Sequence, residues 1–179
     1  GFSLFKNVSF TVGKEDKIAF VGNEMSITAL FSVLTEEAEQ TKGEFKWGIS
    51  TSRSYFPHDN SAYFNGHNET IIDWMRNYST DQTEAYLRGF LGRMLFSGDS
   101  VYKPVNVLSG GEKVRCMFSR MMLKGANVLI LDQPTDHLDL ESITAVNNGL
   151  NDFKSIVLFT SHDYEIVNTV ANRIIEITP

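Results

Sequence analysis

The sequence has a single cysteine, lacks long apolar runs and is short of basic residues, and each shortage excludes a class of protein. One cysteine, Cys116, cannot form an internal disulfide, which agrees with a reducing compartment. Cys116 lies in a helix-like apolar pattern, so we expect a packed structural thiol and no nucleophile. Because no run approaches the roughly 18 apolar residues that span a bilayer, and no basic-then-apolar leader opens the chain, we expect a cytoplasmic protein.

The charge balance limits the partners. Lysine and arginine number 16 against 22 aspartates and glutamates, for a formal net charge of −6 at pH 7. Proteins that bind nucleic acid over a whole surface neutralise its phosphates with lysine and arginine. The sequence therefore predicts no direct DNA binding, although a local basic patch is compatible with it.

Length and composition favour one globular domain. The 179 residues are 42% apolar and 21% charged, which is enough to bury one core. The chain enters a strand-like pattern at once with GFSLFKNVSF and leaves one with NRIIEITP, so we expect a fragment of a longer chain. No internal repeat or low-complexity segment is present.

Strand patterns alternate with helix patterns along most of the chain. Val8–Val12 alternates apolar and polar residues as a half-buried strand does. Short apolar runs typical of strands buried on both faces follow: KIAFVG at 17–22, VLIL at 128–131, SIVLFT at 155–160 and RIIEI at 173–177. From Thr28 onward, Leu30, Phe31 and Leu34 are spaced for one helix face. This order predicts an α/β domain with a mainly parallel sheet, whose ligands gather at the carboxyl ends of the strands.

The stretch from about 60 to 104 has a different pattern. TIIDWMRNY and EAYLRGFLGRMLF are helix patterns rich in aromatic residues and methionine. We expect a helical insertion here, a subdomain of about 60–104 set into a core subdomain of about 1–59 and 105–179.

The octet LSGGEKVR predicts a helix that begins at Ser109. Ser109 and Glu112 stand three apart, as a capping box requires, and apolar residues follow at helical spacing. With Gly110 and Gly111 in the first turn, backbone N–H groups lie uncovered at the positive end of the helix dipole, which suits an anion. The octet by itself fits equally well a capped helix with a glycine-rich start and no ligand.

Two polar residues follow buried strands. Asp132 ends the strand at 128–131, where a carboxylate can hold a phosphate-bound Mg²⁺ directly or through water. His162 follows the strand at 155–160, at the same edge of the sheet if the strands are parallel. Each residue has a structural explanation, Asp132 as a cap and His162 as a hydrogen-bonded loop residue. Their order and spacing after the octet favour a shared site.

Together these motifs resemble the nucleotide-binding domains of ABC ATPases, and most of all the ABC-F group. LSGGEKVR resembles the signature motif, VLILDQ the Walker B strand, HLD the D-loop with Asp139, and SHD the switch histidine. KWG, SYFP, LRGFLGRMLFSGD and NVLSGGEKVR resemble the second, C-terminal domain of one bacterial branch. The resemblance implies a P-loop NTPase-like fold with an N-terminal antiparallel strand region, and ATP and Mg²⁺ as cofactors. It also implies a second such domain as partner, on the same chain or in a homodimer mate.

The first expected loop departs from the family's GxxxxGK[ST]. Anchored on TALFSVL, the resemblance places Gly22, Asn23, Ile27, Thr28 and Ala29 at the nucleotide. Thr28 then supplies the Mg²⁺-binding hydroxyl, and Ile27 stands where the family has lysine. An ungapped count from Gly22 instead puts Thr28 on the lysine. Both alignments lose the ammonium, and side chains stand where glycines let amides close around a phosphate. We therefore expect a weak ATP site.

Two further departures concern metal binding and catalysis. Gln133 occupies the place of the family's glutamate that orients or deprotonates water, and an amide accepts no proton. Gln133 is either natural or a deliberate exchange of glutamate for glutamine. His58 in SYFPHDN stands where the family's Q-loop glutamine contacts water or metal, or is a surface residue with no role. With Gln133 and His162 as the catalytic residues, this domain alone is expected to hydrolyse ATP poorly.

The leading hypothesis is the ATP-binding half of an ABC-F ATPase that pairs head to tail. Ser109, Gly110, Gly111 and Glu112 then serve the partner's ATP, and the ribosome is a candidate target. One alternative is a non-catalytic partner that only completes the other domain's site. Another is the ATPase subunit of a membrane transporter, although membrane subunits are not expected partners. Phe5 is a weak candidate for the residue that stacks on adenine, because such a residue more often packs in the core.

Overall fold

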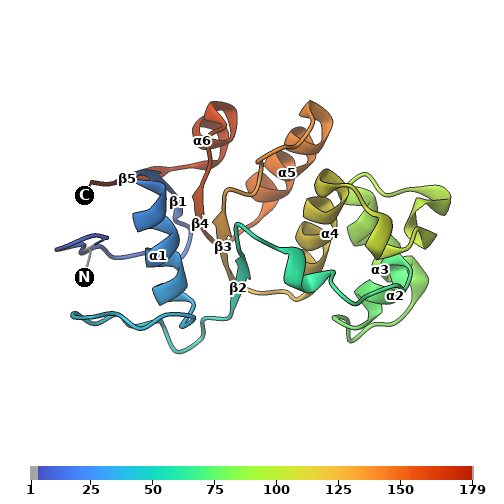
Figure 1. Cartoon of the computed structure of the whole chain (residues 1–179), viewed down its shortest axis with the longest axis horizontal. Coiled ribbons are helices and arrows are strands. Elements are labelled where there is room, and N and C mark those ends of the chain that lie inside the picture. The colour runs from blue at the N-terminus through green and yellow to red at the C-terminus, as the bar shows by residue number, and fades with distance from the viewer. Residues whose placement is uncertain (1–3, 179) are drawn as a thin grey trace. The chain divides into compact units, whose positions relative to one another are not determined.

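The computed structural model describes residues 4–178, which form a parallel sheet and a set of helices (Figure 1). The chain divides into two compact units. The first takes in the described residues up to His58, Ala126–Pro134 and those from Lys154 on. The second consists of Asp59–Gly125 and Thr135–Phe153.

The first unit is built on one five-stranded sheet. Its strands are β1 (Lys17–Gly22), β2 (Arg53–Phe56), β3 (Val128–Asp132), β4 (Ile156–Thr160) and β5 (Arg173–Ile177). They lie in the order β2-β3-β4-β1-β5, and every neighbouring pair is parallel. All residues of β3 and β4 are buried, as expected of parallel strands covered on both faces. The predicted α/β fold with a parallel sheet is confirmed.

The predicted strand at Val8–Val12 is wrong. The segment carries no strand pairing, although its residues are alternately half-buried and exposed as the sequence pattern implies. Phe10 packs edge-to-face on Phe20 of β1, with ring centroids 5.6 Å apart, and Val8 and Val12 also rest against the core. An alternation of apolar and polar residues shows only that successive side chains point to opposite sides of an extended segment. Packing of one side on the core is enough to explain it, without a hydrogen-bonded neighbouring strand. The expected antiparallel pairing is therefore not formed here.

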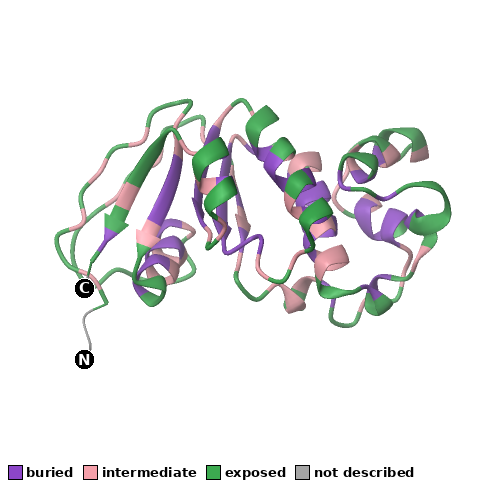
Figure 2. Cartoon of the chain, turned by 90° about the horizontal axis from the view of Figure 1, so that it is seen from above, coloured by how far each residue is buried: buried purple, intermediate pink, exposed green. Residues whose placement is uncertain are grey.

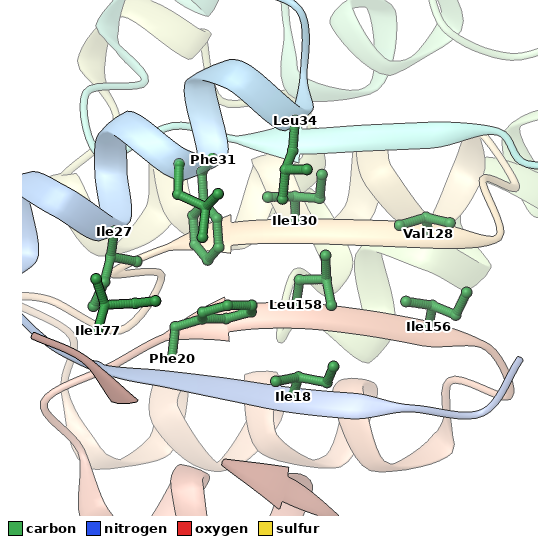
Figure 3. Close-up of a cluster of buried hydrophobic side chains, with 11 residues drawn as sticks. Ile18, Phe20, Ile27, Phe31, Leu34, Val128, Ile130, Ile156, Leu158 and Ile177 are labelled. Carbon is green, nitrogen blue, oxygen red and sulfur yellow. The ribbon is translucent and has the colours of Figure 1, made fainter. Parts of the chain in front are cut away.

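Helix α1 (Glu24–Leu34) covers the sheet and closes the core of this unit. Figure 3 shows its apolar side chains above β1, β3 and β4. The cluster consists of Ile18, Phe20, Ile27, Leu30, Phe31, Leu34, Val128, Ile130, Ile156, Leu158 and Ile177. Burial of each such side chain stabilises the fold by about 1.5–3 kcal/mol. The unit also contains α6 (Tyr164–Val170).

The second unit is helical. It contains α2 (Ile71–Arg76), α3 (Glu84–Arg93), α4 (Gly110–Leu123) and α5 (Leu140–Asp152), with three short 3₁₀ turns. Figure 2 shows helices with a buried side and an exposed side, the result of apolar residues at helical spacing. The expected insertion at about 60–104 lies inside this unit, which also takes in α4 and α5. No helix in the described part of the chain is long and apolar enough to cross a bilayer.

Candidate functional site

Because the strands of the first unit are parallel, their carboxyl ends meet at one edge of the sheet. Asn23 follows β1, His58 follows β2, Gln133 follows β3 and His162 follows β4. Asp132, the last residue of β3, pairs in register with Thr160, the last residue of β4. This is the edge where parallel α/β sheets bind ligands, so it brings together the residues that sequence patterns place there.

Helix α1 begins four residues earlier than the predicted start at Thr28, and that prediction is wrong. Asn23 is its N-cap: the side-chain Oδ1 accepts a hydrogen bond from the N–H of Ser26 at 3.0 Å. Asparagine is among the strongest N-cap residues, and without glycines the following residues stay helical. A single residue, Asn23, therefore connects β1 to α1.

Gly22 has a packing role within the sheet. Its φ is +115°, and a Cβ there would overlap the carbonyl oxygen of Ile177 in β5. That same oxygen accepts a hydrogen bond from the N–H of Asn23 at 3.1 Å. The glycine is required by the approach of β5, whether or not a nucleotide binds.

Ile27 is part of the hydrophobic core. Only 1% of it is exposed, and its side chain lies beside Ile177 (Figure 3). The sequence resemblance places Ile27 at the position of the family's lysine, but its side chain points into apolar surroundings. Phe5, the weak candidate for adenine stacking, also packs against this core.

Thr28 and Asp132 lie in direct contact. The Thr28 hydroxyl donates a hydrogen bond of 2.7 Å to Oδ2 of Asp132, which is 1% exposed. Hydroxyl and carboxylate oxygens are ligands that Mg²⁺ prefers, so this pair fits the ion. No group of three or more His, Cys, Asp or Glu side chains suited to a metal occurs in residues 4–178. A metal at Thr28 and Asp132 would need further oxygens from phosphate or water. Ala29 is half-buried, and His58 is exposed.

Gln133 holds a strained and buried position. Its φ is +49°, an uncommon value for a residue with a side chain, and it is 7% exposed. Its Nε2 lies 3.5 Å from the Thr160 hydroxyl, while its Oε1 has no hydrogen-bond partner among the described residues. A buried acceptor left unpaired costs about 1–3 kcal/mol. Such strain beside Asp132 is typical of functional sites.

His162 pairs with a residue that sequence reasoning missed. Its Nε2 lies 2.9 Å from Oε1 of Glu24, the first residue of α1, and the two side chains are 62% and 61% exposed. An acidic residue directly after an N-cap is a recognisable helix-start signal, but its pairing with a residue 138 positions later is not visible in the sequence.

The predicted helix start at Ser109 is confirmed. Ser109 is the N-cap of α4; its hydroxyl accepts from the N–H of Glu112 at 3.3 Å, and Glu112 Oε2 accepts from the N–H of Ser109 at 2.8 Å. Among the described residues, none accepts a hydrogen bond from the N–H groups of Gly110 or Gly111. A Cβ at Gly110 would meet nothing within 4 Å, and one at Gly111 would make only an ordinary contact with Leu138.

Lys103 forms an ion pair with the glutamate of this capping box, and sequence reasoning also missed this residue. Its Nζ lies 2.8 and 3.0 Å from the two carboxylate oxygens of Glu112. Partial burial raises the pKa of Glu112, but the hydrogen bonds from Lys103 and from the Ser109 N–H outweigh it and leave that pKa below its ordinary value.

Two further predicted positions have clear structural explanations. Asp139 is the N-cap of α5, where it accepts from the N–H of Ser142 at 2.7 Å; this hydrogen bond lowers the pKa of its carboxyl. Cys116 is fully buried in α4, and burial raises the pKa of its thiol far above the ordinary value. The thiol is therefore a packed structural group, as expected.

Comparison with known proteins agrees with this geometry. The family described as ABC transporter matches residues 5–136. The chain is 62% identical to the uncharacterized ABC transporter ATP-binding protein YkpA of Bacillus subtilis, over 100% of the chain and 34% of that protein. It is 29% identical to ABC transporter F family member 5 of Arabidopsis thaliana, over 97% of the chain and 25% of that protein. The chain thus spans about a third or less of these relatives.

Two solved structures share the fold. One is a dimeric bacterial ABC transporter cassette, with a TM-score of 0.77 and 16% identity, covering 97% of this chain and 86% of that one. The other is a complex of the archaeal ribosomal stalk protein aP1 with the archaeal ribosome recycling factor aABCE1. Its TM-score is 0.79 with 23% identity, covering 93% of this chain and 32% of that one. At these identities the likeness concerns the fold alone.

Proposed function

This chain belongs to the ABC transporter family, and we propose that it is one of two nucleotide-binding domains that pair head to tail to bind and hydrolyse ATP. In that arrangement each ATP lies between the strand edge of one domain and the signature helix of the other. The chain supplies α4 to the partner's ATP and its own strand edge to a second, weaker site. Its relatives are ABC-F ATP-binding proteins about three to four times its length, which leaves room for the second domain.

The observation that carries this proposal is the open start of α4. Two glycines in a helix cost up to about 1 kcal/mol each relative to alanine, and internal packing does not call for one at Gly110. What the missing side chains provide is access to two N–H groups without acceptors, at the positive end of a 14-residue helix. An anionic phosphate from a facing domain fits this end, while Ser109 and Glu112 hold its geometry.

The start of α1 has the opposite character, which supports a weak site on the chain's own side. The Asn23 side chain already accepts the hydrogen bond of the Ser26 N–H, and the Glu24 carboxylate lies in the first turn. A triphosphate there would compete with the internal cap and meet a like charge. Low-micromolar binding of Mg·ATP to the isolated chain in a calorimetric titration would contradict this part of the proposal.

Thr28 and Asp132 would hold Mg²⁺, which when bound would neutralise charge on the phosphates. His162 presents an imidazole at the same edge, in reach of a terminal phosphate once it leaves Glu24. Gln133 orients water through its free Oε1 but accepts no proton. General-base help is typically worth 10² to 10⁴ in rate, so this half turns over slowly.

The proposed setting is the ribosome. The support is the ABC-F naming of a relative and the likeness in fold to a ribosome recycling factor. Asp139, at the start of α5, is proposed to contact the partner domain. Ribosomal particles that copurify with the full-length protein would support the setting, and membrane subunits in their place would contradict it.

The test compares two matched helix caps in the full-length protein. Ser109→Ala removes the cap of α4, and Thr70→Ala removes the equivalent cap of α2, whose hydroxyl accepts from the Asp73 N–H at 3.2 Å. Each loss costs about 1 kcal/mol of stability. We expect ATP turnover to fall at least about tenfold only with Ser109→Ala, a loss of about 1.4 kcal/mol. Equal turnover in the two variants would overturn the proposal.

A third variant separates the catalytic reading from the alternative of a non-catalytic partner. Asp132→Asn removes the carboxylate that would hold Mg²⁺ at this chain's own edge. If turnover falls with Ser109→Ala and is unchanged with Asp132→Asn, this half only completes the other site. The closed start of α1 is the observation that favours this alternative.

A further inference from the structure

We propose that Lys103 is a positioning residue for the phosphate contact of α4: by holding the Glu112 carboxylate, it keeps the first turn of that helix attractive to an anion. This inference rests on the proposed function, and it assigns a role to a residue outside the signature octet.

The first turn of α4 contains two opposing charges. The helix dipole and the free N–H groups of Gly110 and Gly111 attract a phosphate. The carboxylate of Glu112, which follows directly after these two glycines, repels a phosphate. A unit charge acts strongly at the short distances within one helical turn, so an unneutralised Glu112 would offset much of the attraction.

Lys103 removes this conflict. Its ammonium bridges both carboxylate oxygens of Glu112 at 2.8 and 3.0 Å. The pair is partly shielded from solvent, with the two side chains 39% and 21% exposed, so salt screens it less than a surface pair. Oε2 of Glu112 still accepts from the Ser109 N–H at 2.8 Å. The carboxylate can therefore complete the capping box while its charge is matched.

The local backbone fixes Lys103 at this place. The N–H of Ile71 donates to the Lys103 carbonyl at 3.0 Å, and that of Val105 donates to the Glu69 carbonyl at 3.0 Å. These bonds tie the segment before α4 to the start of α2. The backbone that carries the Lys103 ammonium is therefore held in place by hydrogen bonds.

The experiment is a double-mutant cycle on the ATP dependence of turnover in the full-length protein. Lys103→Met removes the charge and keeps the stem, Glu112→Gln keeps a capping-box residue without the charge, and the double variant combines them. Lys103→Arg is the conservative replacement. Lys124→Met is the matched control, because it removes an exposed ammonium at the C-cap of α4, the opposite end of the helix from Glu112.

The expected result is a rise in KM with Lys103→Met of about three- to tenfold, with kcat changed less, the scale of one unmatched charge near the phosphate in partly screened surroundings. Lys103→Arg should restore most of the affinity, and Lys124→Met should leave KM within about twofold. The decisive result is that Lys103→Met costs far less in the Glu112→Gln background. Thermal unfolding of every variant shows whether the cost lies in the fold.

An equal rise of KM in both backgrounds would mean that Lys103 only braces the segment, and would overturn the inference. So would an unchanged KM with Lys103→Met. If Ser109→Ala itself leaves turnover unchanged, both the proposed function and this inference are wrong. If Ser109→Ala abolishes turnover while Lys103→Met is silent, only the inference fails.

Discussion

The Nε2 of His162 lies 2.9 Å from the carboxylate of Glu24, at the first turn of α1. A carboxylate therefore lies at the helix start where the proposed nucleotide site would hold a phosphate. Beside it, the Asn23 side chain accepts a hydrogen bond from the Ser26 N–H, so under the proposal a nucleotide would have to compete with contacts made within the chain.

The charge of Glu24 should weaken nucleotide binding more than it stabilises the fold. An exposed ion pair is worth about 0.2–1 kcal/mol, so Glu24→Gln should cost no more than about 1 kcal/mol in unfolding free energy. The same change should raise the affinity of the chain for Mg·ATP about threefold or more, because one like charge is removed. Calorimetric titration measures it, with Glu36→Gln as control: that glutamate pairs with Arg53 beyond the other end of α1.

Replacing Ile27 with the family's lysine should damage the fold and not rebuild the site. Ile27 is 1% exposed, so Ile27→Lys buries an ammonium in the core and should cost about 3–5 kcal/mol. Met25→Lys, on the same helix at 70% exposure, should stay within about 0.5 kcal/mol. Urea unfolding compares them. A stable Ile27→Lys variant with tighter ATP binding would show that residue 27 does not lie in the core in solution.

The two glycines Gly22 and Gly110 should respond in opposite ways to alanine. Gly22→Ala meets the Ile177 carbonyl at a positive φ and should lose about 1–3 kcal/mol of stability. Gly110→Ala has free space and should lose none, or gain up to about 1 kcal/mol. Only Gly110→Ala should lower turnover of the full-length protein without lowering its melting temperature. Wild-type turnover in that variant would argue against a ligand at α4.

The Glu112 carboxyl should titrate below its ordinary value of 4.5. Since its folded-state pKa is lowered, its stabilising contribution is fully present above the unfolded-state pKa and is lost as pH falls through the folded-state pKa. In Lys103→Met the midpoint should rise, because the largest favourable partner is gone. Carbon-detected NMR titration of the Glu112 carboxyl measures both midpoints. An unshifted midpoint in Lys103→Met would mean that the contact between Lys103 and Glu112 is not formed in solution.

Features within a few residues of one another could be predicted. The capping box of Ser109 and Glu112 depends on two side chains three residues apart, and the structure confirms it. The buried runs at β1, β3 and β4 were also predicted, because strands covered on both faces consist almost wholly of apolar residues. The strand at 173–177 was predicted too, but β5 is the last strand of the sheet and most of its residues are exposed or half-buried, with only Ile177 buried. Parallel pairing then brought Asp132 and His162 to one edge, as their positions after strands implied.

Features that depend on distant partners could not. The alternation of Val8–Val12 is real, but whether it forms a strand depends on a neighbour that the pattern does not contain. Gly22 has the place of a loop glycine in the family, while its conformation is required by β5, 155 residues later. The motif likewise assigned Ile27 to a phosphate, and only the packing of α1 placed it in the core.

The sequence by itself determined the fold class, the start of α4 and the residue types at the strand edge, because these follow from local hydrogen bonding and from the periodicity of burial. The tertiary structure alone decided that α1 begins directly after its N-cap Asn23, that Glu24 pairs with His162, and that Lys103 neutralises the charge of Glu112. The physical reason is that ion pairs and close backbone approaches depend on which segments the fold brings together, and a linear pattern carries no such distance.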